Sequence, residues 1–178
     1  LLTYLEGNQH LFPQDVQDRW VENNVFGYYR MIREKFFENL HQSFEEKGEI
    51  SSETVSSILS DIIQSHYKSL KNTDYADEMT QDHFKTIKSR YKESFKKIKL
   101  RVFESAHLNP RTSSKLYDIA TYIHVKNIFS HNVSGVVIAG YGDSEIYPKI
   151  KALDIEGLVE DKLKYRKNED KSSDITDG

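Results

Sequence analysis

Two histidines in the second half of the chain are the residues whose types and spacing best suit a metal-binding or catalytic role. His124 and His131 stand seven residues apart, and Asp118 lies upstream of them. Imidazole and carboxylate groups can ligate a metal or serve as a general base, so a metal or general-base site is one interpretation. The imidazoles share a helical face only if a helix continues through Asn132, which the Ser-His-Asn sequence argues against. We favour polar residues that close a helix end, where a histidine complements the helix dipole.

Basic residues crowd a predicted helical segment between residues 85 and 101. Interleaved with Tyr91 and Phe95, they could follow a phosphate backbone, so a helical nucleic-acid-binding module is an alternative function. The two aromatic residues, however, fall on the apolar stripe of the segment, which favours core packing over base stacking. The net charge of -3 favours a solvated basic face, or a face for an acidic neighbouring subunit. The nucleic-acid candidates are Lys88, Arg90, Lys92, Lys96, Lys97 and Lys99.

A polar turn provides a third candidate. Asp143, Ser144 and Glu145 follow Gly142 and could bind a cation or polarise a water, although turn residues are more often chosen for backbone reasons. The glycines on either side of Tyr141 do not form a phosphate loop, because a strand rather than a helix N-terminus follows them. The chain has no cysteine, which excludes disulfides, thiolate zinc sites and cysteine nucleophiles. We therefore expect no cofactor and assign no catalytic residue.

Composition limits the class of protein. The chain has 178 residues, 37% of them apolar and 30% charged, which suits one globular domain with long two-faced helices. No apolar run approaches the roughly 18 to 20 residues of a membrane span, and the first residues lack the features of a signal peptide. We expect a cytoplasmic protein with no membrane partner.

Hydrophobic periodicity predicts about four helices before the chain reaches residue 131. The first begins at Pro13 and ends before Gly48, with a possible interruption between residues 23 and 27. The others are expected from Ser51 or Ser52 to Leu70, from Thr80 to the segment before Pro110, and from Thr112 to Phe129. The stretch KNTDYADEM between the second and third helices reads as a loop.

The periodicity then changes to that of a sheet. Val136 to Ala139 form a short apolar run between glycines, which predicts a strand covered on both faces. A second extended run from about Tyr147 to Glu156 can return antiparallel, and Glu160-Asp161 predicts another tight reversal. Two or three strands alone are marginal in water, so we expect further strands, and we expect them before Leu1.

The strand region resembles the paired strands of the proteasome-type, N-terminal-nucleophile hydrolase fold. The matching residues are Ala139-Gly140-Tyr141 and Asp154-Ile155-Glu156-Gly157; with LLTYLEGNQHLFPQDVQ, the pattern is similar to a family of bacterial proteasome-like proteins. The resemblance implies a β sandwich into which the helices are inserted. Enzymes of this fold use a threonine, serine or cysteine at a processed amino terminus, and Leu1 is none of these. Thr3 becomes terminal only if two residues are trimmed, so we expect no hydrolytic activity in this chain itself.

Together these observations predict an α+β chain, in which a long-helix layer precedes a C-terminal antiparallel strand pair that is part of a proteasome-like sandwich. The helical region is placed at residues 1–131, the β region at 132–166 and a polar tail at 167–178. We expect a catalytically incomplete portion of a bacterial proteasome-like protein that acts through assembly. Its partner is expected to be a second polypeptide, or another copy that pairs with the strand edge at Val136 to Gly140. A hydrolase whose nucleophile lies outside this chain is the third alternative.

Overall fold

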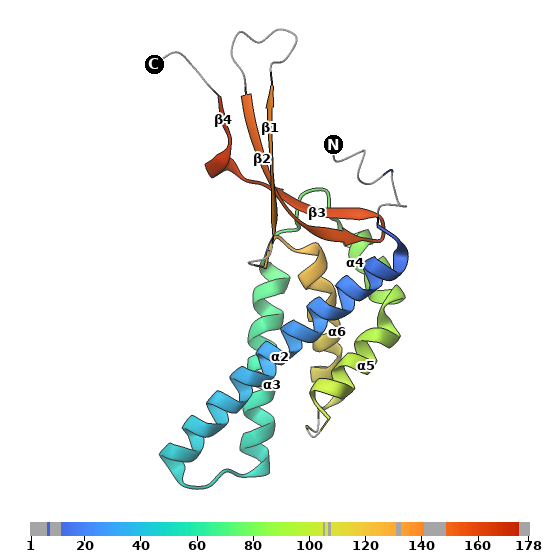
Figure 1. Cartoon of the computed structure of the whole chain (residues 1–178). Helices are drawn as coiled ribbons and strands as arrows, with labels where there is room; N and C mark the ends of the chain where they lie inside the picture. The colour runs from blue at the N-terminus through green and yellow to red at the C-terminus, as the bar shows by residue number, and fades with distance from the viewer. Residues whose placement is uncertain are drawn as a thin grey trace.

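The computed structural model describes Gly7 and residues 12–104, 106, 108–130, 133–140 and 149–174. Within these residues the fold is α+β with the helices before an antiparallel sheet, as the sequence predicts, but there are five helices rather than about four (Figure 1). None of the described helices is long and apolar enough to cross a membrane. The helices are α2 (Gln14–Lys47), α3 (Ser52–Asn72), α4 (Gln81–Arg90), α5 (Lys92–Val102) and α6 (Pro110–Val125).

The first two helices begin and end where the sequence predicts. Pro13 precedes α2, and Gly48 ends it with a φ of 74°, a left-handed conformation that glycine adopts without steric cost. The possible interruption between residues 23 and 27 does not occur, so α2 is one continuous helix. The hydroxyl of Ser51 caps α3 by accepting a hydrogen bond from the main-chain N–H of Thr54 at 3.2 Å.

The prediction of one helix after Thr80 is wrong, because the chain turns at Tyr91 and forms α4 and α5 instead. Tyr91 leaves helical geometry with φ -92° and ψ 11°. Its side chain is buried, and its hydroxyl donates to Asp18 on α2 at 2.8 Å. The change of direction lets α4 pack on α6 while α5 packs on α2. The spacing of the apolar residues does not reveal this break, because the apolar residues of α4 and α5 face the same core.

The last helix is shifted toward the N-terminus relative to the prediction. Pro110 is the first residue of α6, and the side chain of Asn109 accepts from the N–H of Thr112 at 2.8 Å. The helix ends at Val125 rather than Phe129, because Lys126 instead forms a β-bridge with Tyr75 from the loop between α3 and α4. This bridge fastens the start of the β region to the helical layer.

Four strands form the sheet of the described residues. β2 lies between β1 and β3, and β4 pairs with the first residues of β2. β1 and β2 pair antiparallel, with Ser134 opposite Ile155 and Gly140 opposite Lys149, which confirms the predicted pairing for the described residues. The strands are β1 (Ser134–Gly140), β2 (Lys149–Val159), β3 (Lys162–Lys167) and β4 (Ser173–Asp174), with the short 3-10 helix η2 (Glu169–Lys171) before β4.

The expectation that β1 is covered on both faces is wrong. The side chains of Val137 and Ile138, which point to opposite faces of the sheet, are 63% and 45% exposed. Figure 1 shows the reason: β1 and the first part of β2 project away from the helices, whereas β3 and the last part of β2 lie over them. An apolar run thus predicts a strand, but it does not show that other residues of the same chain cover both faces of that strand.

The sheet and helices meet most closely where β2 passes Trp20 on α2. A Cβ atom added to Gly157 would lie 2.4 Å from the nearest atom of the indole ring. Beyond this point, Val159 joins the core between the helices, whereas Leu158 belongs to a smaller cluster on the other side of the sheet. Glycine is therefore required at position 157 by the approach of the indole.

We expect Gly157→Ala to lower the free energy of unfolding by roughly 1 to 3 kcal/mol, because the new methyl group must displace the indole of Trp20. Urea unfolding followed by circular dichroism measures this change. Gly135→Ala is the matched control on the neighbouring strand, since nothing lies within 4 Å of a Cβ added there. Equal midpoints for the wild type and Gly157→Ala would contradict the packing described.

Candidate functional site

The junction between α6 and the sheet contains a completely buried lysine. The ammonium of Lys164 on β3 donates to the main-chain oxygens of Ile123 and Ile128, at 2.7 Å and 2.6 Å, and forms an ion pair with Glu156 at 2.6 Å. Three acceptors surround a group that has three donors. Lys164 therefore binds one carbonyl in the last turn of α6 and one in the segment that follows it, and a positive charge at this helix end also complements the helix dipole.

Glu156 reaches this ammonium because β2 contains a bulge. Ile155 is opposite Tyr165 and Gly157 is opposite Lys164, so Glu156 is the extra residue between them. Its other carboxylate oxygen accepts from the N–H of Ser130 at 2.7 Å. The bulge thus directs one side chain to both the buried cation and the segment that leads from α6 to β1.

His124 lies beside the lysine and is also completely buried. Its Nδ1 is 2.7 Å from the carbonyl oxygen of Ala120, and its ring packs edge-on against Trp20. The carbonyl accepts a hydrogen bond from Nδ1 in the tautomer that carries the ring proton on this nitrogen. Burial, and then the charge of Lys164, lowers the pKa of His124 to about 3. The imidazole is a neutral core residue that solvent does not reach.

The turn between β2 and β3 is fixed by the helices. Glu160 and Asp161 have φ values of 50° and 58°, which form the tight reversal that the sequence predicts. Gln17 on α2 donates to the carboxylate of Asp161 at 2.9 Å and accepts from its main-chain N–H at 3.2 Å. Arg90 forms an ion pair with Glu160 at 2.7 Å. These contacts compensate for left-handed conformations that non-glycine residues rarely adopt.

The contacts of this junction hold the sheet on the helices. Lys164 pairs with Glu156 and Arg90 pairs with Glu160, and the imidazole of His124 is closed off from solvent. In the part of the chain that the structure describes, no three histidine, aspartate or glutamate side chains are grouped so as to hold a metal ion. His131, the other candidate ligand, and the predicted polar turn of Asp143, Ser144 and Glu145 lie outside the described residues.

The six cations proposed for nucleic-acid binding do not form one free face. Most of them have partners within the chain: Lys88 pairs with Asp118, Arg90 with Glu160 and Asp18, and Lys96 with Glu93. Lys99 donates to Ser113 and lies over the ring of Tyr117. Of the described contacts, none joins Lys92 or Lys97 to an acidic side chain. Nucleic-acid binding stays a prediction, but fewer of these six basic side chains are without a partner in the chain than the sequence implies.

Two other surfaces are open to partners. One is the projecting hairpin, where Val137 and Ile138 are exposed and no described strand pairs with the outer edge of β1. The other is a groove between α2 and α5, which the sequence analysis did not identify. Its signal was present, because Phe26, Arg33 and Leu40 repeat every seven residues along α2. The groove is lined by Phe26, Arg30, Arg33, Glu34, Phe37, Arg101 and Val102.

In comparisons with known proteins, no family model, no curated protein and no solved structure matched the chain.

We expect Lys164→Ala to lower the free energy of unfolding by about 3 to 5 kcal/mol, because Glu156 and the carbonyls of Ile123 and Ile128 lose their buried cation. Lys164→Met, which keeps most of the side-chain length, should also be strongly destabilised. Chemical denaturation measures both variants against Lys167→Ala, an exposed position on the same strand that should change stability by less than about 0.5 kcal/mol. A Lys164→Met variant as stable as the wild type would show that the charge is dispensable.

His124 should make stability depend on pH. Its folded pKa is about 3, below the value of about 6.5 in an unfolded chain, so only the unfolded state binds the proton between these values. The contribution is fully present above about pH 6.5 and falls by roughly 1.4 kcal/mol per pH unit as the solution is acidified toward pH 3.

Urea unfolding at several pH values should therefore show a steeper loss of stability in the wild type than in His124→Phe. His41→Gln, at an exposed position, is the control and should retain the wild-type slope. Identical slopes in the wild type and His124→Phe would mean that the histidine is not buried in its neutral form.

Proposed function

We propose that this chain is a catalytically incomplete portion of a bacterial proteasome-like protein, and that it acts through assembly. The observation that carries the proposal is the projecting β1–β2 hairpin. Its strands are regular and antiparallel, yet Val137 and Ile138 present apolar side chains to solvent on both faces. A strand of this composition is typical of a sheet buried on both sides.

The edge of β1 supports the same proposal. A strand at the edge of a sheet offers unpaired main-chain donors and acceptors, and proteins usually protect such edges with charges, proline or a covering element. The described part of β1 reads Ser-Gly-Val-Val-Ile-Ala-Gly, with no charge and no proline. Further strands that pair with this edge would extend the sheet into the sandwich that the resemblance implies.

The helical layer gives this assembly a rigid base. β3 and the end of β2 are fixed to α2 and α6 through Gln17, Trp20 and Lys164. The hairpin is therefore held at a defined angle to the helices, ready to receive a strand from another polypeptide or from a second copy. Backbone pairing would supply affinity, and the exposed valine and isoleucine would supply the apolar contact.

Lysine substitutions on β1 test the proposal. We expect the wild type to associate in a concentration-dependent way in multi-angle light scattering, and we expect the double variant Val137→Lys, Ile138→Lys to be a monomer with unchanged helical circular dichroism. Charges on an edge strand oppose pairing with another chain, whereas these exposed positions contribute little to folding.

Leu100→Lys is the matched control, because Leu100 is 56% exposed on α5, away from the sheet. It should associate like the wild type. A wild type that stays monomeric at all concentrations, or a Leu100→Lys variant that is equally dispersed, would overturn assembly through the β1 edge.

A further inference from the structure

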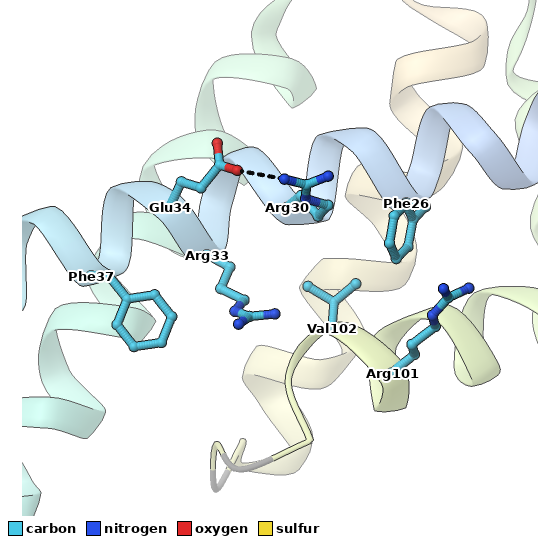
Figure 2. Close-up of a pocket in the computed structure, with 7 residues that line it drawn as sticks. All are labelled: Phe26, Arg30, Arg33, Glu34, Phe37, Arg101 and Val102. Carbon is cyan, nitrogen blue, oxygen red and sulfur yellow. Dashed lines mark hydrogen bonds and ion pairs between the residues drawn. The ribbon is translucent and has the colours of Figure 1, made fainter.

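We infer that the groove between α2 and α5 binds an acidic amphipathic helix of a partner protein. The groove has a volume of about 410 Å³. Figure 2 shows Arg33 and Arg101 reaching into it from α2 and α5, with Val102 between them and a phenylalanine of α2 on either side. It lies on the helical layer and is separate from the hairpin, so the inference does not depend on the proposed assembly.

The outward face of α2 has the spacing of a helix-pairing seam. Phe26, Arg33 and Leu40 form one set of positions seven residues apart, and Arg30, Phe37 and Phe44 form the other. The two sets alternate at spacings of four and three residues, which is the pattern along which two helices pack. From residue 26 to 44 the seam extends about 27 Å, at 1.5 Å per residue. A helix is therefore the partner whose shape fits this stripe.

The fold uses only part of this seam, because Phe26 and Leu40 are partly buried against the core. The inward stripe, with Val25, Tyr29 and Ile32, is completely buried among the other helices. On the outward stripe, Phe37 and Phe44 are 50% and 53% exposed. Figure 1 shows why: the C-terminal half of α2 extends beyond the end of α5. One helix thus carries two stripes, of which the fold buries the first and covers the second only in part.

The charges of the groove select an acidic partner. Arg30, Arg33 and Arg101 contribute three guanidinium groups, and Glu34 is the single carboxylate that lines the groove. Glu34 pairs with Arg30 at 3.1 Å. Within the described residues, Arg33 and Arg101 contact aromatic rings, Phe37 and Phe26 respectively, and no carboxylate. Guanidinium groups bind carboxylates through two parallel hydrogen bonds, so glutamate or aspartate on the incoming helix would pair with them.

A designed peptide serves as the probe. It has about three heptads, with leucine at the seam positions and glutamate beside them; the glutamates also prevent the peptide from pairing with itself. We expect saturable binding to the wild type in fluorescence anisotropy, weakened when salt is raised from about 0.05 to 0.3 M. The matched peptide with lysine in place of glutamate should not bind.

Charge reversal in the protein tests the location. Arg33→Glu with Arg101→Glu should weaken binding of the glutamate peptide about tenfold or more and should allow the lysine peptide to bind instead. The control is Lys68→Glu with Arg111→Glu, which makes the same change in net charge at exposed positions on α3 and α6. This control should bind the glutamate peptide like the wild type. All four positions are exposed, so the variants should fold, and thermal unfolding checks this.

Two further variants complete the experiment. Phe37→Ala should weaken binding without changing the salt dependence, because it removes an apolar anchor and no charge. The Val137→Lys, Ile138→Lys variant should bind the peptide normally, so failure of the hairpin proposal would not count against the groove.

Several results would overturn the inference. Equal binding of the glutamate and lysine peptides, no binding to the wild type, or equal loss in the control variant would each exclude an acidic helix at this groove. If the wild type self-associates and the Arg33→Glu, Arg101→Glu variant does not, while the peptide fails to bind, then a second copy of the chain occupies the face instead.

Discussion

The ammonium of Lys164 is bound where three parts of the chain meet: the end of α6, the bulge of β2 and the strand β3. Because the group is completely buried, its charge must be matched within the fold, and the two carbonyls and Glu156 provide that match. None of these parts can move away without leaving a buried charge or an unpaired carbonyl. The position of the sheet on the helices therefore depends on this contact together with the apolar packing around it.

Other features of the junction follow from the same constraint. β3 must pass close to α6 for Lys164 to reach the carbonyls, and this brings β2 against Trp20, where only glycine fits at position 157. The reversal at Glu160 and Asp161 must then be tight, and its left-handed residues are stabilised by Gln17 and Arg90. The projecting part of the hairpin, β1 with the first residues of β2, shares none of these contacts. It keeps its direction only because β2 is continuous from the fixed end to the projecting end.

The sequence predicted this fold where local chemistry decides the outcome. Ser51 and Gly48 signal a helix start and a helix end, and the apolar run from Val136 identifies a strand. It failed where a tertiary contact decides. The alternation in β3 places Lys164 with Lys162 and Arg166, a pattern typical of a solvent-facing side, so its burial could not be read from the strand alone. The break at Tyr91 has the same origin, since the hydrogen bond between its hydroxyl and Asp18 on α2 cannot be read from the pattern of one helix. Of the two candidate surfaces, the sequence predicted the strand edge of β1. It did not reveal the second stripe of α2, because the first stripe was enough to predict a helix.

The two open surfaces lie toward opposite ends of the molecule, and α2 connects them (Figure 1). Its N-terminal residues Gln17 and Trp20 contact the sheet, whereas its outward stripe begins at Phe26 and continues to Phe44. A strand added at β1 and a helix bound along α2 would therefore touch different residues and would not exclude each other. Because α2 is continuous and its first turns are fixed to the β2–β3 turn, binding partners at both surfaces would be held in a defined relative orientation. If both proposals hold, the helical layer positions a strand partner and a helical partner relative to each other.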